Sequence, residues 1–351
     1  MIRVKPYIAS MSPYSPPWSN MDRSGFLRLD LNENTLNPPE HVIRALKNWL
    51  DQKRFQMYPE YSRFMPKLAN YAKVEQNQLM LSNGSDQAIE VILRAFLEPG
   101  DEMLIAQPGF PIFEQVTRAI GAVVRGVPYT KNLQFPWDEF MQSLTPDISL
   151  VVLINPDNPT GSSISLSRIR ELLETASDVP VIVDEAYFEY TGITALELLT
   201  EYPNLIITRT FSKAFAMAGL RLGYLIAHPD IVAEFHKIRG PFDINSCAII
   251  AAEAQLDNPA QWQAYIHEIM KVSKPWLENF FVENRISYYP GAAHFMIVEP
   301  KNRDGVVQYL KDNGILVRPM VAPLIRHTFR MNLGTLEQTK RFAEVYMRYR
   351  G

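Results

Sequence analysis

Short apolar runs alternate with amphipathic segments along the first two thirds of the chain. The runs "QLMLSN", "EMLIAQ", "SLVVLIN", "PVIVDE" and "NLIITRT" begin at residues 78, 102, 149, 180 and 204. Between them lie segments with helical spacing of apolar residues, such as "SDQAIEVILRAFL" and "SLSRIRELLETA". Continuous Val, Ile and Leu runs separated by helices are typical of a parallel sheet that is buried on both faces. The pattern predicts an α/β domain whose functional groups gather beyond the carboxyl ends of the strands.

The pattern changes after about residue 245. A long helical region with several candidate breaks runs to about residue 284, and the strand-like runs "HFMIVEP", "ILVRPM" and "TFRMNLG" follow before a last helix over 336–350. We therefore predict three parts. They are an N-terminal arm that also contributes to the smaller domain (1–30), a large domain with a mostly parallel sheet (31–245) and a smaller α+β domain (246–351).

Composition and charge are those of an ordinary globular enzyme. The 351 residues are 47% hydrophobic and 21% charged, with a net charge of −3, which gives no indication of binding to nucleic acid or an anionic membrane. No apolar run approaches the roughly 18 residues that span a bilayer, and the first residues lack the apolar core of a secretion signal. We expect a cytoplasmic protein. The single cysteine, Cys247, excludes an internal disulfide framework.

Polar residues follow the first of the predicted strands. The segment "SNGSDQ" leads from this strand into a helix and places Gly84, Ser85 and Asp86 at the helix N-terminus. Free backbone amides in that position bind phosphate, and a glycine permits close approach of the backbone. An ordinary helix cap explains the same residues equally simply.

Two later strands also end in polar segments. "LINPDNPTG" leaves a strand through Asn158, which lies between two prolines that restrict the turn. "VIVDEAYFEY" places Asp184 directly after buried β-branched residues, with Tyr187 three positions further on. A carboxylate at such a position is costly without a cationic or donor partner. A plain Asn-Pro turn and a turn-capping aspartate are the alternatives.

The segment "TRTFSKAFAMAGLRLGY" sets a lysine between two runs that should be buried. Lys213 follows Thr210 and Ser212, and Arg221 comes eight residues after it. A lysine amine shielded from water has a lowered pKa and can form a Schiff base with an aldehyde. Hydroxyls and a guanidinium suit a phosphate group. Taken one at a time, each of these side chains is also compatible with a solvent-facing position.

Taken together, these side chains fit one cofactor. The ligand needs an aldehyde for Lys213, a phosphate for the hydroxyls and amides, and a ring nitrogen beside Asp184. Pyridoxal 5′-phosphate has all three, and a carboxylate at its ring nitrogen keeps the pyridine protonated so that the ring accepts electrons from a substrate. Asn158 and Tyr187 would form hydrogen bonds to the ring hydroxyl.

The segments "NPDNPTG", "VIVDEAYFEY" and "TFSKAFAMAGLRLGY" resemble the signature segments of fold-type I pyridoxal-phosphate aminotransferases, specifically the histidinol-phosphate aminotransferase-like family. "LRLDLNENT", "MYPEY" and "FRMNLGT" resemble further landmarks of that family in the same order, so the resemblance covers nearly the whole chain. It implies that Lys213 binds the cofactor covalently and that Asp184 is the partner of the ring nitrogen. It also implies a homodimer with shared active sites, in which Tyr58 reaches the cofactor phosphate of the neighbouring subunit.

The resemblance implies further cofactor contacts. Phe110 stands where the family stacks an aromatic ring on the cofactor, often a tyrosine, and phenylalanine keeps the stacking without the hydroxyl; a core phenylalanine is the alternative. Asp157 stands where many relatives carry a neutral residue. The residues implied around the cofactor phosphate are Gly84, Ser85, Thr210, Ser212 and Arg221, and Asp86 is a further cofactor-binding candidate.

Substrate contacts are expected on the smaller domain and the arm. Strand alternation in "HTFRMNLGT" separates Arg330 from the apolar face, where its guanidinium is suited to grip a carboxylate through two parallel hydrogen bonds; a wet strand face is the alternative. The resemblance adds an N-terminal tyrosine, for which Tyr14 is the candidate and Tyr7 the alternative. The remaining candidate substrate ligands are Asn34 and Arg318. Arg326 is a further candidate for a phosphate contact, and a position on the protein surface explains it equally well.

The main functional hypothesis is an aminotransferase that moves an amino group from a small donor to a keto acid, by resemblance histidinol phosphate to 2-oxoglutarate in histidine biosynthesis. An aromatic amino acid aminotransferase and a threonine-phosphate decarboxylase use the same cofactor core and are alternatives. A non-catalytic cofactor-binding regulator is the alternative from outside the class. The six histidines show no paired metal-ligand spacing, so no metal site is predicted.

Overall fold

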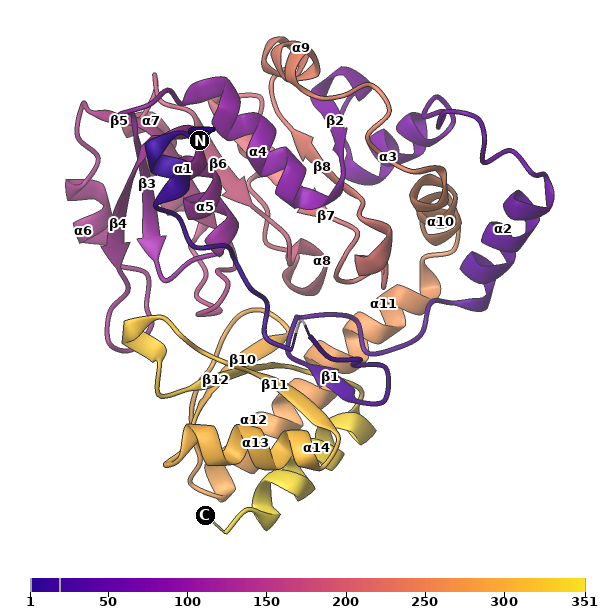
Figure 1. The fold of residues 1–351 in the computed structure, drawn as a ribbon, viewed down its shortest axis with the longest axis vertical. Coiled ribbons are helices and arrows are strands. Elements are labelled where there is room, and N and C mark those ends of the chain that lie inside the picture. Colours follow the sequence, from indigo (N-terminus) through magenta and orange to yellow (C-terminus); the bar gives the residue numbers. More distant parts are fainter. Residues whose placement is uncertain (1, 19, 351) are drawn as a thin grey trace.

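The computed structural model describes residues 2–18 and 20–350, and it contains two β-sheets flanked by helices (Figure 1). The larger sheet has the strand order β2-β8-β7-β6-β5-β3-β4, and the smaller sheet has the order β1-β11-β12-β10-β9. The strands of the larger sheet are β2 (Leu79–Ser82), β3 (Glu102–Gln107), β4 (Val123–Pro128), β5 (Ile148–Ile154), β6 (Val181–Asp184), β7 (Leu205–Thr210) and β8 (Gly223–Ile226). Those of the smaller sheet are β1 (Leu27–Leu29), β9 (Ser287–Tyr289), β10 (Phe295–Glu299), β11 (Ile315–Pro319) and β12 (Phe329–Asn332).

The larger sheet is mostly parallel, which confirms the predicted α/β class. Strands β3 to β7 pair in parallel, whereas β8 runs antiparallel to its neighbours β2 and β7. Every apolar run assigned to this sheet forms a strand. The runs do not predict β4 and β8, because β4 is a largely exposed edge strand interrupted by Arg125 and Gly126, and β8 is only four residues long.

The antiparallel strand β8 brings the functional segments to one edge of the sheet. Because β2 and β7 both run against β8, the carboxyl end of β2 lies at the same edge as those of β5, β6 and β7. The register places Ser82 and Thr210 on either side of Gly223, and Asp184 beside Thr208. The polar segments that follow these four strands therefore converge.

The smaller sheet combines both ends of the chain. Strand β1 pairs in parallel with β11, and the other pairs are antiparallel. The strand-like runs after residue 290 all form strands, whereas the three-residue β9 carries too little pattern to predict. The domain boundaries near residues 30 and 245 stay predictions.

Helices cover the sheets. The predicted long helical region after residue 245 is α10 (Ser246–Asp257), α11 (Ala260–His267), a π-helical turn (Glu268–Ser273) and α12 (Lys274–Glu283), and the predicted last helix is α14 (Leu336–Arg348). The other α-helices are α1 (Pro6–Ala9), α2 (Glu40–Asp51), α3 (Phe64–Ala72), α4 (Gly84–Phe96), α5 (Pro111–Ile120), α6 (Trp137–Gln142), α7 (Leu166–Thr175), α8 (Phe188–Thr191), α9 (Pro229–Ile238) and α13 (Arg303–Asp312). Short 3-10 turns lie at Gln76–Gln78, Leu196–Leu198, Ala218–Leu220 and Pro323–Ile325. None of the helices in the described part of the chain is long and apolar enough to cross a membrane.

Both faces of the larger sheet are buried. Along β5, Val151 and Leu153 join one apolar cluster, while the alternating Leu150 and Val152 join the other. Successive side chains of a strand point to opposite faces, so apolar layers lie on both sides of the sheet. This explains why the central strands read as unbroken apolar runs.

A buried ion pair joins the ends of β6 and β7. The side chains of Arg209 and Glu185 are 1% and 0% exposed, and their nitrogen and oxygen atoms lie 2.9 Å apart. The Glu185 carboxylate also accepts hydrogen bonds from the Thr194 hydroxyl and the Ala195 amide, at 3.0 and 2.6 Å. The guanidinium stacks 3.8 Å from the ring centroid of Phe188. The pair therefore fixes the strand ends next to Asp184 with most of its polar atoms satisfied.

We expect Arg209→Met to lower the free energy of unfolding by about 3–5 kcal/mol, because the Glu185 carboxylate would remain buried without its cation. Urea unfolding followed by fluorescence measures the change. The matched control is Arg94→Met, which breaks the exposed pair with Glu90 on α4 and should cost less than ~1 kcal/mol. Equal losses in the two variants would contradict a structural role for the buried pair.

Candidate active site

A cavity of about 140 Å³ lies at the converging strand ends. Its lining comes from the segments after β2, β5, β6 and β7, together with the segment that leads into α5. The lining residues are Ser85, Asp86, Phe110, Asn158, Asp184, Ala186, Tyr187, Thr210, Ser212, Lys213 and Arg221. All of them except Ala186 are residues that the sequence singled out.

Lys213 is held inside this cavity. Its Nζ donates a hydrogen bond to the Leu31 carbonyl at 3.0 Å. Burial, and secondarily the positive charge of Arg330, lowers the pKa of the lysine from 10.5 to about 8. A solvated surface lysine would show neither feature, and the lowered pKa gives Lys213 a larger neutral fraction at neutral pH than an ordinary lysine has. Its role as the nucleophile stays a prediction that this geometry suits.

Asp184 ends β6 at the floor of the cavity. The Thr208 hydroxyl donates to its carboxylate at 2.8 Å. Burial raises the pKa of Asp184 from 3.8 to about 6, although the Thr208 hydrogen bond opposes the shift. A protonated ring nitrogen would supply the cation that this buried carboxylate needs.

The N-terminus of α4 forms one end of the cavity. Asn83 makes no side-chain capping hydrogen bond there, so the first amides of the helix lack side-chain capping by this residue. Gly84 has a φ of +72°, and a Cβ at this position would come within 2.3 Å of the Arg221 guanidinium. Arg221 in turn pairs with Asp86 at 2.8 Å. Only glycine allows the guanidinium this close to the helix end, where both would face an anion.

Hydroxyl groups complete the anion-binding end. Thr210 and Ser212 contribute theirs from the end of β7, with the Ser212 amide donating to the Thr210 hydroxyl at 3.1 Å. Gly223 of β8 lies behind them, and a Cβ there would come within 2.6 Å of the Ser85 nitrogen. Sequence reasoning missed Gly223, because nothing in "LRLGY" shows which helix end it touches.

The other side of the cavity carries Tyr187 and Asn158. The Tyr187 hydroxyl accepts a hydrogen bond from the Asn32 amide at 2.9 Å, and burial raises the pKa of Tyr187 to about 12, so the phenol stays protonated at neutral pH. The Asn158 carbonyl oxygen accepts from Arg330. Asn32 was not predicted as a site residue. Its backbone has a φ of +54°, and its backbone N–H donates to the side-chain oxygen of Asn332 at 3.1 Å.

Arg330 lies above this side of the cavity on β12. It also donates to the Asp30 carbonyl at 2.8 Å, while its Nε is buried without a hydrogen-bond partner among the described residues. Burial lowers the pKa of Arg330 from 12.5 to about 10, so the guanidinium keeps its charge at neutral pH. Arg318 is its direct cross-strand partner on β11, and it donates to the Tyr14 hydroxyl at 2.8 Å.

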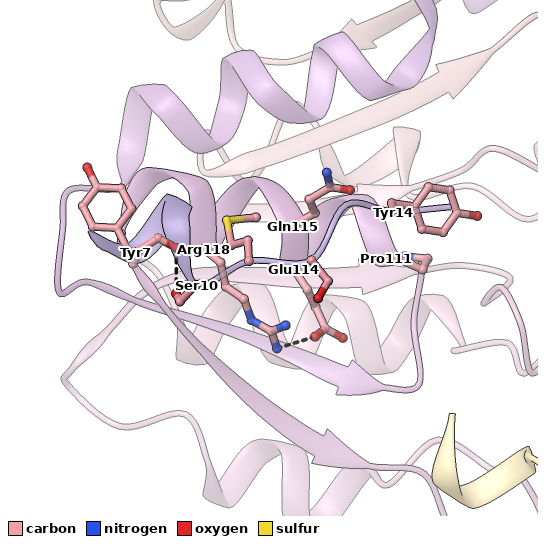
Figure 2. Close-up of a pocket in the computed structure, with 11 residues that line it drawn as sticks. Tyr7, Ser10, Tyr14, Pro111, Glu114, Gln115 and Arg118 are labelled. Carbon is pink, nitrogen blue, oxygen red and sulfur yellow. Dashed lines mark hydrogen bonds and ion pairs between the residues drawn. The ribbon is translucent and has the colours of Figure 1, made fainter. Parts of the chain in front are cut away.

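The arm residues line a second cavity. Tyr7 and Tyr14 both border a hollow of about 520 Å³ over α5, and Figure 2 shows them at opposite ends of it, with the Glu114–Arg118 pair between them. The Tyr7 ring packs against Gly121, where a Cβ would come within 3.0 Å of it. Of the two candidate tyrosines, Tyr14 contacts Arg318 of the smaller sheet, whereas Tyr7 lies at the other end of α5, next to Gly121.

Three other predicted residues lie outside the 140 Å³ cavity. Tyr58 is 73% exposed and stacks on Phe242 with ring centroids 4.3 Å apart. The Asn34 amide is engaged at both ends with backbone groups, the Ala214 carbonyl at 3.0 Å and the Leu36 amide at 2.9 Å. Arg326 is exposed. Their assigned roles stay predictions.

Asp157 is buried next to Asn158. Its carboxylate accepts hydrogen bonds from the amide and the hydroxyl of Thr160, at 2.9 and 2.7 Å. Burial raises the pKa of Asp157 to about 7 in spite of these hydrogen bonds. In this structure the residue braces the Asn158 turn. Among the described residues, no group of three or more His, Cys, Asp or Glu side chains is arranged to hold a metal ion.

The cavity fits pyridoxal 5′-phosphate on the chemistry of its donors. An amine, a buried carboxylate and an anion-binding helix end lie around one space, as the aldehyde, ring nitrogen and phosphate of that cofactor require. The buried Asp184 carboxylate and the uncapped α4 terminus are the two features that gain most from such a ligand.

Known proteins are similar to this chain in sequence and in fold. Residues 24–345 match the family model "Aminotransferase class I and II". Histidinol-phosphate aminotransferase 2 of Haemophilus influenzae is 32% identical over 95% of this chain and 94% of its own length. A histidinol-phosphate aminotransferase of Dehalococcoides mccartyi is 34% identical over 90% of this chain and 88% of its own. The solved histidinol-phosphate aminotransferase from Sinorhizobium meliloti, in complex with pyridoxal-5′-phosphate, covers 99% of this chain and 98% of its own with a TM-score of 0.88 and 25% identity.

We expect cofactor-free protein to take up pyridoxal 5′-phosphate covalently about ten times faster at pH 7 than at pH 6, with half the maximal rate at about pH 8 and a plateau above about pH 9. The reason is that only the neutral amine of Lys213 attacks an aldehyde, and its pKa is about 8. Stopped-flow absorbance gives the rate, and borohydride reduction with peptide mapping gives the position.

Lys213→Ala should abolish covalent uptake, whereas Lys237→Ala, which changes an exposed lysine on α9, should keep the wild-type profile. A rate that keeps rising until about pH 10.5, the ordinary lysine pKa, or an adduct at another position, would contradict the assignment.

Proposed function

The chain belongs to the class I and II aminotransferase family, and from this premise we propose that it transfers the amino group of histidinol phosphate to 2-oxoglutarate. It is a pyridoxal-phosphate-dependent enzyme. The donor and the acceptor are the proposed part. The names of the relatives at 32% and 34% identity support the donor.

The paired arginines of the smaller sheet carry the proposal. Arg318 and Arg330 face each other across β11 and β12, and like charges in that relation repel. An anion placed beside both relieves this repulsion. Among the residues that the structure describes, the buried Nε of Arg330 has no hydrogen-bond partner, and a buried donor in that state costs about 1–3 kcal/mol. A substrate with a phosphate or carboxylate group therefore gains binding energy here.

The proposed division of labour follows from position. Arg330 donates a hydrogen bond to Asn158, one of the proposed cofactor ligands. This position suits Arg330 to bind the carboxylate of the keto acid. Arg318 lies further out with Tyr14 and suits the phosphate of histidinol phosphate. A planar guanidinium binds either anion through paired hydrogen bonds.

The chemistry then falls to the chain's own side chains. When bound, the cofactor supplies an aldehyde that takes the amino group and a ring that accepts the electron pair of the substrate carbon. Lys213, once released by the donor, moves the proton between the substrate α-carbon and the cofactor carbon, and a pKa of about 8 suits it to act as base and acid in turn. The Leu31 carbonyl holds the free amine 3.0 Å away.

The remaining residues orient the ring in this proposal. Asp184 keeps the ring nitrogen protonated. Tyr187 donates a hydrogen bond from its phenol to the ring hydroxyl, and Asn158 forms a second hydrogen bond to the same hydroxyl. Phe110 covers one face of the ring, where its stacking keeps water away.

We expect wild-type protein to use histidinol phosphate in preference to phenylalanine, tyrosine and threonine phosphate, with 2-oxoglutarate as acceptor. Arg318→Gln should raise the KM for histidinol phosphate roughly 10- to 100-fold, because a hydrogen bond to a charged group contributes about 1.5–3 kcal/mol. A coupled assay of glutamate formation measures the KM for each amino donor and the kcat with it.

The control is Arg348→Gln, which changes an exposed arginine at the end of α14 and should leave KM unchanged. Release of carbon dioxide from threonine phosphate without need for a keto acid would reject transamination as the activity. A preference for phenylalanine or tyrosine would reject the proposed donor while leaving the aminotransferase reaction intact.

An exposed apolar patch supports a homodimer with shared sites. Phe55, Met57, Tyr58 and Phe242 are all exposed, and two of them stack on each other. Exposed aromatic residues in contact mark surfaces that other proteins cover. The proposed partner is a second copy of the chain, with the Tyr58 hydroxyl donating to the cofactor phosphate of that copy.

Tyr58→Phe should therefore leave the dimer intact, because the ring and its stacking remain, and should raise the dissociation constant for pyridoxal 5′-phosphate roughly tenfold through the lost hydrogen bond to the phosphate. Sedimentation velocity and fluorescence titration of cofactor-free protein measure the two properties. Tyr309→Phe on α13 is the matched control. Monomeric wild-type protein that binds the cofactor with full affinity would contradict the shared site.

A further inference from the structure

A buried lysine lies outside the cavity that holds Lys213. Lys274 is the first residue of α12 and only 9% exposed. Its Nζ donates to the carbonyl of Gly291 and, at 3.1 Å, to the carbonyl of Ala293. Both hydrogen-bond partners are therefore backbone oxygens of one turn, residues 290–293, immediately before β10.

The helix is irregular at the point that buries this lysine. The buried stripe of the helix contains Trp262, Tyr265, Ile269 and Ser273 up to the π-helical turn, and continues as Lys274, Leu277 and Phe281 after it. The step along the stripe from Ile269 to Lys274 is five residues, whereas a regular helix face repeats every three or four residues. The π-helical turn shifts the register and turns Lys274 inward.

A lysine is a costly choice for such a position. Removing an ammonium group from water costs several kcal/mol unless polar partners compensate, and burial lowers the pKa of Lys274. An apolar side chain would fill the same place without that cost. The two carbonyl contacts are therefore what the lysine adds, and they fix the turn 290–293.

That turn touches the larger sheet backbone to backbone. A Cβ at Gly161 would come within 2.7 Å of the Gly291 Cα, and a Cβ at Gly291 would come within 2.9 Å of the Gly161 Cα. The Ala292 amide donates to the Gly161 carbonyl at 2.7 Å. Gly161 also has a φ of +74°. The contact leaves no space for a side chain on either partner.

Gly161 closes the turn that carries Asn158. Its amide donates to the Asp157 carbonyl at 2.9 Å, so the position of Gly161 and the position of Asn158 are linked through one short turn. Asn158 accepts a hydrogen bond from Arg330. Arg330 is the cross-strand partner of Ile297 on β10, the strand that the 290–293 turn leads into.

The loop between β5 and α7 therefore meets the smaller sheet and its preceding turn at two neighbouring contacts, Gly161 with Gly291 and Asn158 with Arg330. Figure 1 shows α11 leading from α10 towards the part of the molecule that contains the smaller sheet and α12. Lys274 lies at the start of α12 and fixes the first contact. The second contact joins the proposed carboxylate ligand to the proposed cofactor ligand.

We propose that Lys274 is a positioning residue for substrate binding, which seats the 290–293 turn on Gly161 and so holds Arg330 in line with Asn158. The proposal rests on the proposed function only in taking Arg330 as the site of a substrate carboxylate. Lys274 is not among the residues that line the 140 Å³ cavity. Its effect on the reaction runs through the relative placement of the two sheets.

The test separates carboxylate binding from the identity of the amino donor. Holoenzyme is titrated with succinate, a dicarboxylate without amino or keto group, and binding is followed by the absorbance of the bound cofactor. Lys274→Met should raise the dissociation constant for succinate about tenfold, because small misplacements of a binding group carry losses of this order or more. The affinity of cofactor-free protein for pyridoxal 5′-phosphate should stay within about twofold, since the cavity residues are untouched.

Three further variants make the result specific. Lys274→Arg keeps a cation and several donors and should restore most of the succinate affinity. Gly291→Ala forces the turn away from Gly161 without removing the lysine and should weaken succinate binding in the same direction. Lys271→Met changes an exposed lysine of the π-helical turn and should have no effect.

Wild-type succinate affinity in Lys274→Met, or an equal loss of cofactor and succinate affinity, would overturn the proposal. Wild-type protein that does not bind succinate would overturn it as well, because Arg330 would then not hold a carboxylate. Failure to turn over histidinol phosphate rejects only the proposed donor, since succinate binding does not depend on it. If Lys274→Met does not fold, Gly291→Ala with intact cofactor binding and unchanged succinate affinity would decide against the proposal.

Discussion

The removal of Asp184 and Lys213 from water is the constraint on which the rest of the site depends. Burial moves the carboxyl pKa up to about 6 and the amine pKa down to about 8, so both groups change charge close to neutral pH. A carboxylate at this depth needs donors, and the Thr208 hydroxyl provides one. The lysine needs an acceptor, and the Leu31 carbonyl provides it. Only strand ends inside a fully covered sheet bring both groups this deep within one small cavity.

The central strands could be predicted because their environment is uniform. β5, β6 and β7 are buried on both faces, so nearly every position must be apolar, and the sequence shows it directly. β4 lies at an edge of the sheet, and its residues are exposed, half-buried or buried without regular alternation. β9 has only three residues. Neither strand therefore shows a period of apolar and polar residues that predicts it. The antiparallel direction of β8 is set by its pairing with β2, which begins 144 positions earlier, and no local pattern encodes that distance.

The cavity residues could be predicted for a related reason. Each of them follows a strand end or opens a helix, where a polar residue next to a buried run stands out. Apart from Gly223, the residues that were missed come from a different part of the chain. Leu31 acts through its carbonyl, which sequence does not reveal, and Asn32 reaches Tyr187 because of a left-handed backbone. In "LNENT" the two asparagines look alike, yet Asn32 enters the site while Asn34 binds backbone groups instead.

The division of the site between two sheets determines what substrate binding can achieve. The side chains proposed to bind the cofactor follow strands of the larger sheet, and the paired arginines belong to the smaller one. In the proposed mechanism a substrate anion and the reacting carbon are therefore held by different parts of the molecule. Arg318 and Arg330 repel each other across β11 and β12, and the backbone ladder holds them in place despite this. An anion that relieves the repulsion stabilises the arrangement in which both sheets contact the substrate. Binding energy from the distant anionic group then serves to orient the reacting carbon over the cofactor, which is the use of remote binding energy that accelerates a reaction rather than merely tightening the complex.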